Sequence, residues 1–193
     1  MAMKTKVDLK QVFNDPEALL FQKATVDLSG SSAVALAPEY DLPVTVDTLQ
    51  ITQDDPTVNH YKIIGLAGDW TSSATIGDTS IQFTVPTNHT DVLKLAYGED
   101  AVKAITATVT GTTTIDGSWE GNSLDLKQHK VTGTFVLVDA ERKNLFIVTN
   151  TALYAKVLYE NSGTSPFAVQ FTGTIEGAGT PCMAWLTKTV AAG

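Results

Sequence analysis

The chain has 193 residues, with 13 Lys and Arg against 21 Asp and Glu, so its formal net charge at pH 7 is −8. This excess of negative charge disfavours tight binding to nucleic-acid phosphates, which requires clustered Lys and Arg. Cys182 is the only cysteine, which excludes an intrachain disulfide framework and a cysteine-based metal cluster. The 28 threonines and few long charged side chains are typical of pleated sheets with β-branched polar residues on an exposed face.

The first 23 residues contain no apolar run long enough for a secretory signal, and no stretch of the chain approaches membrane-spanning length. We therefore expect a protein that stays in the cytoplasm and does not contact a membrane. Within this stretch, Asp15 followed by Pro16 is typical of a helix start and predicts a short helix through residues 18–21. Residues 1–23 and 188–193 are expected to be extended arms.

Alternation of apolar and polar residues, with many β-branched side chains, predicts strands along most of the chain. The predicted strands are residues 24–28, 44–52, 60–64, 70–76, 80–85, 105–110, 123–128, 131–138, 145–149, 153–159, 168–175 and 183–187. The apolar phase shifts inside the second of these, which predicts a bulge near Asp47 and Thr48. Residues 139–144 predict a hairpin turn, and residues 30–43 and 53–59 predict longer loops.

One helical pattern interrupts the strands. Pro86 ends a strand, Asn88 or Thr90 can cap a helix, and Gly98 offers a left-handed exit. Four apolar residues between these signals share one helix side: Val92, Leu93, Leu95 and Ala96. The pattern predicts a two-turn helix over about residues 90–97 that lies on a sheet, since it is too short to be stable alone.

These patterns predict a mainly β fold: a β-sandwich or a partly open barrel of antiparallel strands, with one short flanking helix. The length suits a single domain over residues 1–193, because sandwiches and barrels of this size commonly form one core. No repeat of fixed period is present.

No motif in the chain predicts catalysis, a cofactor or a metal site. The three histidines, His60, His89 and His129, are far apart in sequence and lack the spacing of metal ligands. No nucleophile elbow and no phosphate-binding loop occur. The paired carboxylates fall in predicted turns: Asp54 with Asp55, Asp116 with Glu120, and Asp139 with Glu141. The sequence therefore favours a protein that is not an enzyme.

The order of elements resembles a known family. Alternating strands lead into SIQFTVPTNHTDVLKLAYG (residues 80–98) with its single short helix, and further strands end in SPFAVQFTGTIEGAG (residues 165–179). This order is similar to that of the major tail tube proteins of long-tailed bacteriophages and of related prophage and type VI secretion tubes. The resemblance implies a sandwich with one helix that assembles into hexameric rings, which stack into a tube that conducts DNA.

The resemblance also implies where the subunit acts and what it contacts. It predicts a structural protein of the virion tail, assembled in the host cytoplasm, whose partners are copies of itself and other tail proteins. An acidic subunit suits a lumen along which DNA slides. The arms and the loop at 53–59 are then expected to contact the next ring. The candidate contact residues are Val7, Leu9, Val12, Phe13, Asp54, Asp55, Pro56, Thr189 and Val190.

The alternative is a non-catalytic β-sandwich module that binds carbohydrate or protein. It depends on the aromatic residues, because Trp70, Trp119 and Trp185 could form an exposed platform for stacking sugar rings. Aromatic residues at strand positions more often fill a core or an interface, so the sequence leaves both functions open.

Overall fold

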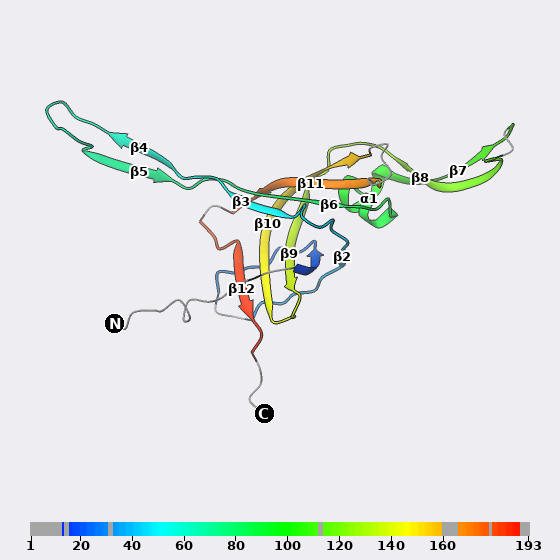
Figure 1. Cartoon of the computed structure of the whole chain (residues 1–193), viewed down its shortest axis with the longest axis horizontal. Helices are drawn as coiled ribbons and strands as arrows, with labels where there is room; N and C mark the ends of the chain where they lie inside the picture. The colour runs from blue at the N-terminus through cyan, green and yellow to red at the C-terminus, as the bar shows by residue number, and fades with distance from the viewer. Residues whose placement is uncertain are drawn as a thin grey trace. The chain divides into compact units, whose positions relative to one another are not determined.

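The computed structural model describes residues 13, 16–30, 33–111, 114–159, 166–177 and 179–189. The fold is mainly β and antiparallel, with one short α-helix among these residues, and its sheets are not closed into a barrel (Figure 1). The predicted class, a β-sandwich with one short helix, is confirmed. No helix in the described ranges has the length and apolar character needed to cross a membrane.

The chain forms two compact units, which are described separately. Unit 1 comprises residues 1–43, 132–150 and 176–193, and unit 2 comprises residues 44–131 and 151–175. The prediction of a single domain over residues 1–193 stays a prediction.

Unit 1 is built on one antiparallel sheet. Its strand order is β2-β1-β9-β10, and β12 also pairs with β10. The strands are β1 (Pro16–Gln22), β2 (Tyr40–Leu42), β9 (Val131–Asp139), the first half of β10 (Asn144–Leu158) and β12 (Met183–Thr187). The core contains Phe21 and Phe135, both buried, with their ring centroids 4.7 Å apart. Aromatic rings at this separation add attraction beyond the apolar area that they bury.

The predicted N-terminal helix is wrong, because residues 16–22 form strand β1. β1 pairs with β2 on one side and with β9 on the other, so its backbone groups bond to neighbouring strands. Leu19 and Phe21 are buried with strand periodicity. Pro16 is tolerated at the first residue of the strand, where a missing N–H costs least. These residues are therefore not an extended arm, and the helix-capping position at Asp15 lies outside the described residues.

The predicted strand at residues 24–28 is also absent. This segment is held to the sheet by threonine hydroxyls instead of a strand ladder. The backbone N–H of Val26 donates to Oγ1 of Thr149 at 3.0 Å, and Oγ1 of Thr134 donates to the carbonyl oxygen of Ala24 at 2.9 Å. Both threonines are buried and their hydroxyl oxygens lie 3.0 Å apart, so each polar group has a partner.

Unit 2 contains the second sheet region, in the order β10-β11-β6-β3, where β10 contributes its second half. The strands are β3 (Gln50–Gln53), β6 (Thr79–Val85) and β11 (Ala168–Ile175). Buried Phe83 and Phe171 are direct partners across β6 and β11, and their rings stack with centroids 5.0 Å apart. The bounds predicted for β11 and β12 are confirmed.

The predicted helix is confirmed as α1 (Thr90–Tyr97), followed by a short 3-10 helix, η1 (Glu99–Ala101). Its N-cap is His89, and neither Asn88 nor Thr90 fills that role: the His89 ring nitrogen accepts the N–H of Asp91 at 3.3 Å. Gly98 ends the helix with φ 93°, as expected for the exit residue. The four predicted apolar residues are buried, together with Tyr97.

Several predicted strand bounds differ from the structure. Residues 44–49 form no strand, and the predicted bulge is a turn in which Asp47 has φ 63° and the Thr48 N–H donates to the Thr45 carbonyl oxygen. The two strands predicted at 145–149 and 153–159 are one continuous strand, β10. The turn at residues 139–144 is confirmed, with Arg142 at φ 54°.

Candidate assembly surface

Two long two-stranded ribbons extend from unit 2, and each leaves the packed sheet (Figure 1). The first joins β4 (Thr57–Tyr61) to β5 (Thr71–Thr75), and the second joins β7 (Val102–Val109) to β8 (Gly117–Leu124). Neither pairs with the larger sheet. Every residue of β4 and β5 is exposed. In β7 and β8, Val102 is buried, Val109 and Leu124 are half-buried, and the other residues are exposed.

The β4–β5 ribbon continues the pairing of β3 with β6. Gln53 pairs with Thr79 at the end of the sheet, and Thr57 pairs with Thr75 in the ribbon, so the register is the same on both sides of the interruption. The N–H of Asp54 bridges the interruption by donating to the carbonyl oxygen of Asp78 at 2.8 Å. The ribbon is therefore a continuation of the sheet rather than an independent loop.

Three predicted contact residues, Asp54, Asp55 and Pro56, lie at this interruption and are exposed. Pro56 has no N–H to donate to an interstrand hydrogen bond, which explains why the strand pairing is interrupted here. The predicted loop at 53–59 is thus shorter than expected, because β4 begins at Thr57.

The β4–β5 ribbon ends in an exposed group of apolar side chains. We call Ile63, Ile64, Leu66 and Trp70 the apolar tip; their exposed fractions are 48%, 106%, 52% and 64%. The backbone N–H of Trp70 donates to the carbonyl oxygen of Tyr61 at 2.8 Å, and this hydrogen bond closes the end of the β4–β5 ladder.

A histidine, a lysine and an aspartate lie beside the apolar tip. His60 Nδ1 lies 2.5 Å from Asp69 Oδ2, and Lys62 Nζ lies 3.9 Å from Asp69 Oδ1. These contacts join the two ends of the tip loop.

The β7–β8 ribbon has one polar and one apolar face. Side chains alternate along each strand, and the register pairs Ala107 with Trp119 and Ile105 with Gly121. One face therefore carries Ile105, Ala107, Val109 and Trp119, which we call the apolar ribbon face, with Lys103 and Ser123 at its base. The opposite face carries Thr106, Thr108, Ser118, Glu120 and Asn122, with Val102, Ala104 and Leu124 at its base.

The apolar ribbon face has open space on both sides of its tryptophan. A Cβ built at Gly117 or at Gly121 would meet no atom within 4 Å. Trp119 is 53% exposed, and its indole N–H donates to the carbonyl oxygen of Ile115 at 3.0 Å. The ring is thus oriented by one hydrogen bond while part of its surface faces solvent.

Solvent exposure of both ribbons has an energetic consequence. An isolated two-stranded hairpin is marginally stable in water, because it has no third strand and no covered face. Apolar side chains on an exposed ribbon, with unpaired strand edges, are the features by which sheets pair with other chains. We interpret the two ribbons as the candidate assembly surface of this protein.

The remaining predicted contact residues are in unit 1. Phe13 packs near Phe146, with ring centroids 6.3 Å apart, and Thr189 is exposed. Val7, Leu9, Val12 and Val190 lie outside the described residues.

The other candidate residues, namely the histidines, the paired carboxylates and the tryptophans, all lie in the described parts of the chain. No group of three His, Cys, Asp or Glu side chains within the described parts of the chain is arranged to hold a metal ion. The three tryptophans are on separate elements: Trp70 at the apolar tip, Trp119 on β8, and Trp185 on β12, where it stacks on Phe146 with centroids 4.9 Å apart.

Sequence reasoning missed both apolar surfaces of the ribbons. In the sequence, two isoleucines and a leucine of the tip lie between Lys62 and Asp69, and Gly65 and Gly68 interrupt this run. That run could have been recognised as an apolar turn. β8 has no apolar alternation of its own, so only its pairing with β7 reveals the shared face.

No protein-family model matches this chain, and no curated protein matches it.

Proposed function

We propose that this protein is a structural subunit that assembles with copies of itself, as a tail tube subunit of a bacteriophage or of a related prophage device. The observation that carries the proposal is the pair of exposed ribbons. Apolar surfaces and free strand edges of this kind become more stable when another chain covers them. In this proposal the protein has no catalytic role and no cofactor.

Closed rings are the assembly that this surface favours. A contact between two different surfaces of identical subunits repeats from one subunit to the next, and it closes into a ring when the rotation allows. Ring closure removes free strand edges that would otherwise pair without control. Stacked hexameric rings would form the tube, and other tail proteins would cap it in the virion tail after assembly in the host cytoplasm.

The net charge of −8 supports the use of the tube as a DNA conduit. An acidic wall repels the phosphate backbone, so DNA slides instead of binding. The proposal therefore includes passage of DNA without tight nucleic-acid binding.

A second candidate function is a non-catalytic module that binds carbohydrate or protein. Trp119 favours it, because this exposed ring lies on a ribbon face between two glycines that leave space for a flat ligand. In this function the ribbon face would bind a sugar ring, and the subunit would remain a monomer.

Light scattering coupled to size exclusion, over a concentration series, separates the two functions. We expect a mass that rises in steps to a ring and beyond. A monomer at every concentration, together with a tryptophan emission shift on addition of oligosaccharides, would instead support the binding module.

A further inference from the structure

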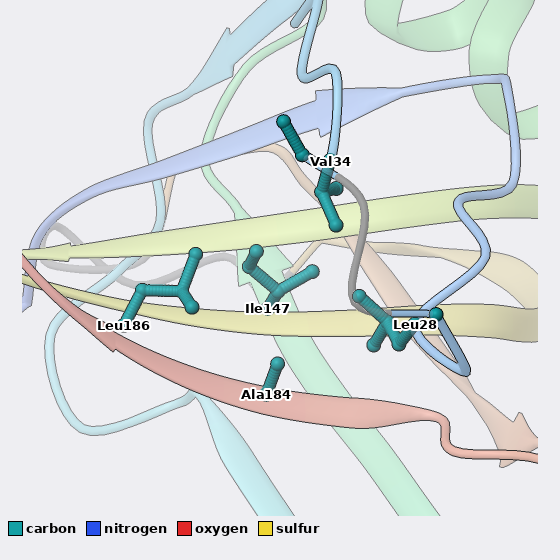
Figure 2. Close-up of a pocket in the computed structure, with 7 residues that line it drawn as sticks. Leu28, Val34, Ile147, Ala184 and Leu186 are labelled. Atoms are coloured by element: carbon teal, nitrogen blue, oxygen red, sulfur yellow. The ribbon is translucent and has the colours of Figure 1, made fainter.

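The described residues of unit 1 line an apolar pocket. Its volume is about 390 Å³. Figure 2 shows that Ile147 comes from β10, Ala184 and Leu186 from β12, and Leu28 and Val34 from the segment that precedes β2. None of the lining residues carries a charged or polar side chain.

The pocket lies where β10 and β12 pair. Ile147 is a direct partner of Ala184, and it is fully buried. The small Ala184 side chain leaves room beside Ile147. Leu186, two residues further along β12, is 42% exposed. The pocket is therefore an apolar hollow between the β10–β12 strand pair and the segment that precedes β2.

The apolar tip is at the end of the β4–β5 ribbon and has the same apolar chemistry as the pocket. Its Ile64 is fully exposed. Burial of an exposed aliphatic side chain is favourable, because its apolar surface leaves water. A pocket of this volume is in the range that encloses a drug-sized molecule, so it has room for more than one aliphatic side chain.

Beside the tip lie Lys62 and, 3.9 Å from it, Asp69, and beside the pocket lies Asp27, so Lys62 and Asp27 are the two groups of opposite charge that can meet across a contact. Lys62 adjoins the tip, and its side chain is 75% exposed. Asp27 precedes Leu28 at the pocket and is exposed. Hydrogen bonds from the Ser29 hydroxyl and the Ser29 N–H lower the pKa of Asp27, so this carboxylate is ionised at neutral pH.

We propose that the apolar tip of one copy inserts into the unit 1 pocket of a second copy. The inference deepens the proposed self-assembly by naming its two surfaces, and it rests on that proposed function. The tip and the pocket are different surfaces, so each copy offers one of each, and the contact passes from subunit to subunit. Lys62 of one copy then faces Asp27 of the next at the edge of the contact.

Disulfide trapping between two copies tests this contact. Both chains carry Cys182→Ser, one of them also carries Ile64→Cys, and the other carries Ala184→Cys and a tag that changes its mass. After mild oxidation of the mixture, we expect the mixed dimer to be the major cross-linked product. Val46→Cys in place of Ile64→Cys is the matched control, because Val46 is 81% exposed and lies outside the tip.

The results separate the inference from the proposed function. Rings or tubes in the unoxidised mixture, with no more mixed dimer than the Val46→Cys control, would overturn the tip contact and leave self-assembly intact. Absence of both assemblies and mixed dimer would overturn both proposals. A further chain carries both Ile64→Cys and Ala184→Cys. If its disulfides form only within one chain, the contact between copies is also overturned.

A charge exchange gives an independent readout. Lys62→Glu should raise the concentration needed for assembly, and adding Asp27→Lys in the same chain should restore it in part. If the single and the double variant raised the assembly concentration equally, the proposed pairing of Lys62 with Asp27 would be contradicted.

Discussion

Gly77 lies directly against the backbone of Asp54, and a Cβ at Gly77 would be 2.1 Å from the carbonyl oxygen of Asp54. This contact is at the point where the β3–β6 pairing continues into the β4–β5 ribbon. Only glycine lets the two strands approach so closely. The position of the apolar tip relative to its own sheet therefore depends on one residue without a side chain.

Gly77→Ala should disconnect the ribbon from the sheet. The added methyl group must displace backbone, so we expect amide hydrogen exchange in β4 and β5 to become faster while protection in β11 is unchanged. Assembly should weaken as well. Gly68→Ala is the control, because a Cβ at Gly68 meets no atom within 4 Å and should leave the exchange pattern as in the wild type.

The two faces of the β7–β8 ribbon provide a second test. Ile105→Lys places a charge on the apolar ribbon face and should raise the assembly concentration roughly tenfold, which corresponds to about 1.4 kcal/mol. Thr106→Lys adds the same charge on the adjacent residue of the opposite face. Light scattering should show a small effect for this control. Equal effects of the two substitutions would contradict a contact through the apolar face.

The core of unit 2 should be sensitive to loss of the stacked ring pair. Phe171→Ala removes a buried ring that stacks on Phe83 and should lower the free energy of unfolding by about 3–5 kcal/mol. Denaturant unfolding followed by circular dichroism measures this change. Tyr154→Ala, at a residue of β10 that is 42% exposed, should cost clearly less. A similar loss for both would show that the stacked pair is not central to this core.

The hairpin turn of unit 1 predicts a dependence of stability on pH. The carboxylate of Asp139 accepts the backbone N–H of Asn144 at 3.0 Å, that of Lys143 at 2.8 Å, and the Asn144 side-chain amide at 2.6 Å. These bonds, the backbone bond from Asn144 most of all, lower the pKa of Asp139 below its ordinary value of 3.8. Its contribution to stability is complete above the unfolded-state pKa and is lost as the pH falls through the lower folded-state pKa.

Asp139→Asn tests this dependence. The variant should be less stable than the wild type at neutral pH, and it should lose less stability on acidification below pH 3.8, as measured by urea unfolding at a series of pH values. Asp55→Asn, at an exposed carboxylate outside the turn, is the matched control. If Asp139→Asn and wild type lost the same stability on acidification, the proposed role of Asp139 would be wrong.

Elements with local signals could be predicted from the sequence with their bounds. α1 has a proline before it, a glycine after it and an apolar side between them, and β11 alternates without interruption. Both signals depend on neighbouring residues alone. β1 was predicted as a helix because Asp15 and Pro16 are typical of a helix start, whereas its structure is decided by pairing with strands that are distant in sequence.

The candidate assembly surface is harder to predict, because the two ribbons that form it enclose no hydrophobic core. β8 consists mainly of glycines and polar residues, so its sequence lacks the alternation that marks a half-buried strand, and it was predicted at residues 123–128 instead of Gly117–Leu124. Its apolar face exists only because Trp119 lies opposite Ala107 across the ribbon. The pocket of unit 1 joins Leu28, Ile147 and Ala184, which are far apart in sequence.

Negative-stain electron microscopy of the purified protein at high concentration tests the central proposal most directly. We expect rings with an open lumen, or stacked tubes, that require roughly ten times more protein in the Ile105→Lys variant than in Thr106→Lys. Uniform single subunits in the wild type at every concentration would contradict the proposal that this protein assembles with itself.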